Sequence, residues 1–326
     1  MAEKFNIHEF ASFQHSLRQL MGVREIFNSH GVSESEALFA VAQLVNHGFP
    51  EAPAMIEGLK SQLKKNVVLQ EILTGLEMRH RNIMKIGARR LVFADRPLME
   101  RLYQTEGHVF VRHPDNRNEL MVVFTTIFNN FGVSNAVITA QLIECGFSVQ
   151  LLKDCTTNRY LNGVVGCGED LAMVAKWIEK FRLEQRFDRM YVSGYSSGGY
   201  ASLYLTTLIE SDGYIGFSIE SDYSSGGPPE IPFQKKVDLR SNVKPEFLCA
   251  LRDRIASSQY SVRRAIYYDK EMDRDKAEAE NLRGLPNTVF HEIPKSGHAI
   301  PETLIQRDSL AQEFEQIRAH HSPADG

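Results

Sequence analysis

Hydrophobic positions near the start of the chain recur with the spacing of amphipathic helices. Phe10, Phe13 and Leu17 follow one another at intervals of three or four residues, which places their side chains on one face of a helix. No β-rich run interrupts this part of the sequence, and Gly48-Phe49-Pro50 precedes a second helical stretch at 52–64. The pattern predicts a small all-helical region over residues 1–80, with amphipathic helices that could dock a protein partner or a second copy of the chain.

After residue 80 the pattern changes to short apolar runs that alternate with helical stretches. This alternation is typical of β-α-β units around a mainly parallel sheet, so we expect one α/β domain over residues 81–326. The predicted strands are 108–111, 120–125, 147–152, 190–193, 214–219, 264–268 and 288–293. The predicted helices are 136–145, 171–183, 198–209, 275–282 and 301–319.

A long connection separates two of the predicted strands. It covers about 222–260 and opens with Ser224-Ser225-Gly226-Gly227-Pro228-Pro229, a run of residues that favour turns. Connections of this length usually form lids or binding loops. We therefore predict a lid-like or cap-like insertion there that takes part in selecting the substrate.

Composition and charge disfavour some classes of partner and location. The chain has 326 residues and a net charge of -4, which disfavours nucleic acid as the main partner because phosphate binding draws on a surplus of basic residues. No basic segment followed by an apolar one opens the sequence, and nowhere do about 18 apolar residues run uninterrupted. We expect a cytoplasmic protein without a membrane span.

The cysteines and histidines show no metal-binding spacing. None of the four cysteines forms a Cys-x-x-Cys pair, and none is spaced from a histidine in the sequence as metal ligands are. We interpret them as reduced thiols in or near the core. They are Cys145, Cys155, Cys167 and Cys249. The sequence predicts neither a metal site nor a bound cofactor, so the chemistry must come from side chains that act on a small-molecule or acylated substrate.

The strongest chemical signal is Gly194-Tyr195-Ser196-Ser197-Gly198, which satisfies G-x-S-x-G. It lies between a predicted strand and a predicted helix, where a nucleophile elbow would hold Ser196 in a strained, exposed turn. Glycines two residues to either side let strand and helix approach each other closely. We predict that Ser196 is a nucleophile and that the backbone N–H of Ser197 stabilises an oxyanion.

A serine hydroxyl needs a neighbouring base, and His298 is the predicted one. It follows the last predicted strand and precedes the last predicted helix, in Lys295-Ser296-Gly297-His298. A loop at the end of a strand can bring an imidazole within hydrogen-bond reach of the elbow. The sequence contains 11 histidines, and His298 is selected by this position.

The third catalytic member should be an acid on the loop after the strand 264–268. Three aspartates compete for this role there. Asp273 is the first choice because the turn would aim its carboxylate at the histidine. Asp269, at the end of the strand, is the alternative, and Asp275 is interpreted as the N-cap of the next helix.

The order Ser196, Asp273, His298 on this alternation of strands and helices resembles the α/β-hydrolase superfamily over about residues 82–319. The resemblance implies an eight-stranded sheet with the site at its C-terminal edge, no metal, and an acyl-enzyme intermediate. It implies the N–H of Ile127 as second oxyanion donor, although the His-Gly common in the family is absent at Thr125-Thr126.

A fainter resemblance concerns a segment ahead of the elbow. Asp154, Asn158-Arg159-Tyr160 and Gly163 are similar to a pattern found in hydrolases associated with surface-polysaccharide machinery. A turn-rich crossover loop would explain the same residues equally well.

Three functions fit these observations. The first is a serine hydrolase, a carboxylesterase or thioesterase, acting through a catalytic triad. The second is an acyltransferase that uses the same acyl-enzyme but passes the acyl group to a sugar or another alcohol. The third is a binding protein that keeps the fold without catalysis.

Overall fold

The computed structural model describes residues 34–50, 52–62, 66–103, 107–115, 117–156, 158–224 and 243–319. The helical pattern predicted around Phe10, Phe13 and Leu17 lies outside these residues, as does part of the predicted insertion (225–242).

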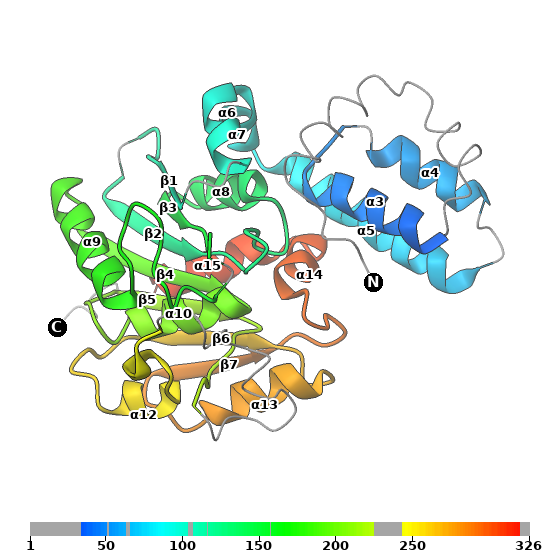
Figure 1. Cartoon of the computed structure of the whole chain (residues 1–326). Coiled ribbons are helices and arrows are strands. Elements are labelled where there is room, and N and C mark those ends of the chain that lie inside the picture. The colour runs from blue at the N-terminus through cyan, green and yellow to red at the C-terminus, as the bar shows by residue number, and fades with distance from the viewer. Residues whose placement is uncertain are drawn as a thin grey trace.

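A mainly parallel sheet forms the centre of the molecule (Figure 1). The strands of the described part are β1 (His108–Val111), β2 (Glu119–Phe124), β3 (Ser148–Leu152), β4 (Arg189–Tyr195), β5 (Gly213–Phe217), β6 (Arg264–Tyr268) and β7 (Thr288–Glu292). They lie in the order β1-β3-β2-β4-β5-β6-β7, and only β1 runs antiparallel to its neighbour. The described residues thus form seven strands, where the resemblance implies eight.

Helices cover both faces of this sheet (Figure 1). They include α6 (Arg89–Ala94), α7 (Arg96–Tyr103), α8 (Asn135–Glu144), α9 (Leu171–Glu184), α10 (Ser197–Leu205), η1 (Pro245–Phe247), α12 (Leu251–Ala256), α13 (Asp273–Asn281), α14 (Ile300–Gln306) and α15 (Leu310–Ala319). Successive side chains of a strand point to opposite faces. Accordingly Met121 and Val123 of β2 belong to the core beneath α8, whereas Val122 belongs to the core beneath α9 and α10.

The last predicted helix, 301–319, is wrong as a single element, because the structure divides it into α14 and α15. Asp308 has φ +59°, a left-handed conformation that ends a right-handed helix. The N–H of Asp308 donates to the carbonyl of Ile305 at 3.0 Å, and that of Ser309 donates to Leu304 at 2.9 Å. These bonds satisfy carbonyls at the end of α14 and redirect the chain.

Three N-terminal helices form a separate layer beside the sheet (Figure 1): α3 (Glu34–Asn46), α4 (Ala52–Gln62) and α5 (Val67–Lys85). They enclose a small apolar cluster of their own, which includes Val41, Ile56 and Leu73. α5 continues through residue 80 and packs on α14, where the Asn82 amide donates to the carbonyls of Ile305 and Gln306 at 3.0 Å each. Of the helices described, none is long and apolar enough to cross a membrane.

Candidate active site

The nucleophile elbow lies between β4 and α10. Ser196 has φ 53° and ψ -122°, a conformation that a residue with a side chain rarely adopts. Backbone hydrogen bonds hold it there. Its N–H donates to the carbonyl of Phe217 at 3.0 Å, and its carbonyl accepts from the N–H of Gly199 at 2.9 Å. The neighbouring strand and the first turn of α10 thus maintain the strain.

The glycines of the motif allow the close packing that this turn requires. A Cβ atom on Gly194 would lie 2.0 Å from Ser202 Oγ and 2.7 Å from the carbonyl oxygen of Gly198. A Cβ atom on Gly198 would lie 2.2 Å from the carbonyl oxygen of Thr125. Both distances to backbone oxygens are too short for any side chain, so both positions need glycine.

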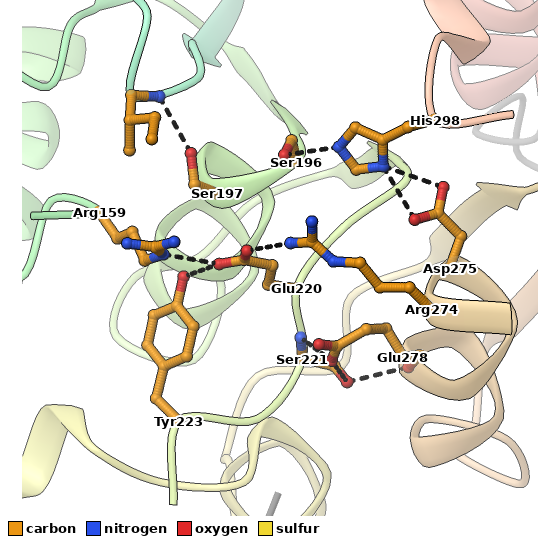
Figure 2. A network of polar contacts seen from close by, with 11 residues as sticks. Arg159, Ser196, Ser197, Glu220, Ser221, Tyr223, Arg274, Asp275, Glu278 and His298 are labelled. Atoms are coloured by element: carbon orange, nitrogen blue, oxygen red, sulfur yellow. Dashed lines mark hydrogen bonds and ion pairs between the residues drawn. The ribbon is translucent and has the colours of Figure 1, made fainter. Parts of the chain in front are cut away.

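The structure brings Ser196 and His298 together, as the sequence predicts. The loop between β7 and α14 carries His298, and its Nε2 lies 2.8 Å from Ser196 Oγ (Figure 2). The hydroxyl of Tyr195 donates to the carbonyl of His298 at 3.0 Å and ties this loop to the elbow. The imidazole is therefore placed to take the serine proton.

The choice of Asp273 as the acid beside His298 is wrong. Asp273 is exposed, whereas Asp275 is buried and its Oδ1 and Oδ2 lie 2.8 and 3.1 Å from His298 Nδ1 (Figure 2). The interpretation of Asp275 as a helix N-cap is wrong too, since the N-cap of α13 is Met272. In the first turn of α13, the third residue faces the sheet edge and the first faces solvent.

Asp269, the alternative acid, holds the loop that precedes His298. It is buried, and its carboxylate accepts from the N–H groups of Glu271, Ser296 and Gly297 at 2.9, 2.8 and 2.7 Å. Burial opposes the charged form, but these backbone hydrogen bonds prevail and lower the pKa of the Asp269 carboxyl. Asp269 thus positions the two residues that precede His298.

Both predicted oxyanion residues lie at the pocket that contains Ser196. The N–H of Ile127 donates to Ser197 Oγ at 3.0 Å, so the Ser197 hydroxyl links the loop after β2 to the elbow. The backbone N–H of Ser197 lies at the N-terminus of α10, where the helix dipole favours negative charge. The missing glycine near Thr125 does not remove Ile127 from the pocket.

The pocket has a volume of about 330 Å³ and is bounded by two parts of the molecule. The loops at the sheet edge contribute Ser196, His298 and Ile127. Helix α3 of the N-terminal layer contributes Gln43 and Asn46, and His47 follows directly at its end. Sequence reasoning missed this contribution, because nothing in the helical pattern indicates which helix faces the sheet.

Four charged residues also line the pocket, and the sequence did not identify them as functional. They are Arg159, Glu220, Arg274 and Glu302. In the sequence, only the resemblance at Asn158-Arg159-Tyr160 had drawn attention to one of these residues. Asp154 and Tyr160 of that region are buried, and Gly163 has φ +74° with a Cβ position 2.0 Å from the carbonyl oxygen of Gly168.

In the described part of the chain, no three His, Cys, Asp or Glu side chains gather in a way that could hold a metal ion.

The sheet and the elbow between β4 and α10 give the chain the α/β-hydrolase fold. No family model and no curated protein matches the sequence. Among solved structures, MenH from S. aureus is similar at 12% identity over 65% of this chain and 97% of its own, with a TM-score of 0.43. Est1E from Butyrivibrio proteoclasticus, with bound ferulic acid, is similar at 13% over 65% and 95%, with a TM-score of 0.45.

An esterase from Pyrobaculum calidifontis is similar at 11% identity over 75% of this chain and 91% of its own, with a TM-score of 0.42. All three likenesses are distant. Conclusions about the chemistry of this protein therefore depend on its own geometry.

Proposed function

We propose that the protein is a serine hydrolase that cleaves an ester or thioester through the triad Ser196, His298 and Asp275. One observation carries the proposal: an unbroken relay in which Ser196 Oγ, His298 Nε2, His298 Nδ1 and Asp275 Oδ1 are joined by two contacts of 2.8 Å. Such a relay on a strained serine is the arrangement that activates a hydroxyl for attack on a carbonyl.

The geometry supports a specific course of proton transfer. Asp275 accepts the Nδ1 proton, which leaves Nε2 unprotonated and able to take the proton of Ser196 as Oγ bonds to the carbonyl carbon. The N–H of Ser197 would then stabilise the oxyanion. The N–H of Ile127, which donates to Ser197 Oγ in the resting site, would join it after releasing that hydroxyl. His298 returns its proton to the leaving alcohol or thiol, and water releases the acyl group from Ser196 by the same steps.

The test is covalent labelling with a fluorophosphonate probe, which reacts with activated serines. We expect stoichiometric labelling of the wild type and none of Ser196→Ala. Ser257→Ala removes the hydroxyl of an exposed residue, the C-cap of α12, and should label like the wild type, which makes it the matched control. A folded wild-type protein that stays unlabelled would refute the proposal and favour a non-catalytic role for the fold. Product analysis with added alcohols would separate hydrolysis from acyl transfer.

A further inference from the structure

Three charged side chains meet in the pocket beside the nucleophile. Glu220, on the loop after β5, is only 2% exposed and lies between the guanidinium groups of Arg159 and Arg274 (Figure 2). Arg159 Nε donates to Glu220 Oε2 at 3.0 Å, and Arg274 Nη2 donates to Glu220 Oε1. The hydroxyl of Tyr223 donates to the same carboxylate. The three segments that carry these residues are far apart in the sequence.

The hydrogen bonds to Glu220 use only part of each guanidinium group. Within the described residues, Arg159 is bonded through Nε alone and Arg274 through Nη2 alone, so both terminal nitrogens of Arg159 and the other two nitrogens of Arg274 remain available. Their side chains are 16% and 33% exposed, and both line the pocket.

Two other acids at this pocket are bonded to different partners, whereas the buried Asp154 adds a negative charge near Arg159 without a hydrogen bond to it in the described residues. The Glu302 carboxylate is paired with Arg79, which is itself outside the lining, and Asp275 is bonded to His298. Glu220 instead acts as a fixed anchor that orients both guanidinium groups. A planar guanidinium with free N–H groups matches the geometry of a carboxylate or a phosphate, and a partly desolvated site strengthens such a charge-assisted bond.

We propose that Arg159 and Arg274 form an anion subsite, which selects substrates that carry a carboxylate or phosphate close to the bond cleaved at Ser196. This inference rests on the proposed hydrolase function and specifies its substrate class. A neutral acyl chain would cover the N–H groups of Arg159 and Arg274 that Glu220 does not use and give them no acceptor, which costs binding free energy. The subsite therefore disfavours simple aliphatic esters.

The experiment compares matched substrates that differ in one charge. On the acyl side, p-nitrophenyl hydrogen adipate is compared with p-nitrophenyl hexanoate. On the alcohol side, 4-acetoxybenzoate is compared with 4-acetoxybenzamide. For at least one pair, we expect the wild type to prefer the anionic member in kcat/KM by about ten- to a hundredfold, the range of one hydrogen bond to a charged group. High salt should reduce the preference.

Variants assign the preference to the arginines. Arg159→Gln should lower the ratio of anionic to neutral kcat/KM at least about tenfold, and Arg159→Lys should restore part of it because the charge remains without the planar fork. Arg274→Gln should act in the same direction while Arg159 still pairs with Glu220. Arg252→Gln removes an exposed arginine on α12 and should leave the ratio unchanged.

Inhibition of neutral-ester hydrolysis distinguishes the two sources of negative charge. Competitive inhibition by inorganic phosphate that is lost in Arg159→Gln supports a phosphate, and the same result with adipate supports a carboxylate. Equal kcat/KM within both pairs, or arginine variants that slow both members of a pair alike, would overturn the subsite. Because Ser196 labelling by the fluorophosphonate is measured separately, that outcome is distinct from a failure of the hydrolase proposal.

Discussion

The two walls of the pocket are built on different principles. At the sheet edge, Ser196 is held by backbone hydrogen bonds to β5 and α10, and the Asp269 carboxylate fixes the loop before His298 through backbone N–H groups. On the opposite wall, side chains join separate layers. Arg79 of α5 donates to Asn46 Oδ1 at 2.9 Å and pairs with Glu302 of α14.

The difference indicates which wall of the pocket holds its side chains in fixed positions and which wall can change shape. Backbone bonds within one sheet position reacting atoms tightly, as proton transfer demands. Side-chain bonds between layers can change without disturbing the sheet, so the helical wall can alter the shape of the pocket independently. We therefore expect changes at the sheet edge to affect mainly kcat and changes at the helical wall to affect mainly KM, while changes at either wall can lower stability.

The largest effect should come from the acid of the relay. Asp275→Asn keeps the volume but presents an N–H₂ group to the imidazole, which favours the wrong tautomer and should lower kcat about 10³- to 10⁴-fold. Asp273→Asn is the matched control two residues earlier on α13 and should cost less than about tenfold, since an exposed charge contributes no chemistry. Single-turnover acylation rates of both variants test which aspartate is the catalytic acid. A larger loss in Asp273→Asn than in Asp275→Asn would assign the role to Asp273.

A smaller loss of kcat should follow from Asp269→Asn. The amide oxygen cannot replace both carboxylate oxygens that accept from Glu271, Ser296 and Gly297. The loop should shift His298 by a fraction of an ångström and lower kcat about ten- to a hundredfold. The same variant should lower the free energy of unfolding, measured in urea, by about 1–3 kcal/mol. Unchanged kcat would show that the loop is held by other contacts.

At the helical wall, Arg79→Gln should reduce stability and raise KM while kcat changes less. The Arg79 and Glu302 side chains are 11% and 20% exposed, so removal of one partner leaves a charge with little access to water. Because this pair is partly exposed, we expect a loss of about 1–3 kcal/mol in unfolding free energy, below the cost of breaking a fully buried pair. Arg81→Gln, on the exposed side of α5, is the control and should cost under about 0.5 kcal/mol. Loss of kcat with KM unchanged would contradict the division between the walls.

The smallest effect concerns the pH dependence of stability. Burial lowers the pKa of His47 from 6.5 to about 4, so the unfolded chain binds this proton more readily than the folded one. The free energy of unfolding should therefore fall as the pH drops from about 6.5 toward 4. Between pH 7 and pH 5, His47→Gln should lose about 1–2 kcal/mol less than the wild type in urea denaturation. Parallel losses would show that His47 is equally protonated in both states.

The sequence by itself determined those features that depend on local pattern. Alternating apolar runs placed the strands of the sheet, because a parallel strand covered on both faces must be apolar throughout. The motif around Ser196 placed the elbow, since only glycine fits at positions 194 and 198 beside backbone oxygens. The position of His298 after the last strand was sufficient to select one histidine among 11.

Only the tertiary structure decided which acid completes the relay and what surrounds the nucleophile. Asp273 and Asp275 are both in the first turn of α13, and the rotation of that helix about its axis decides which one meets His298. Arg159, Glu220 and Arg274 come from three separate segments and carry no joint pattern in the sequence. Their meeting depends on how β5, α13 and the loop after β3 pack together, and a linear pattern does not encode such contacts between distant segments.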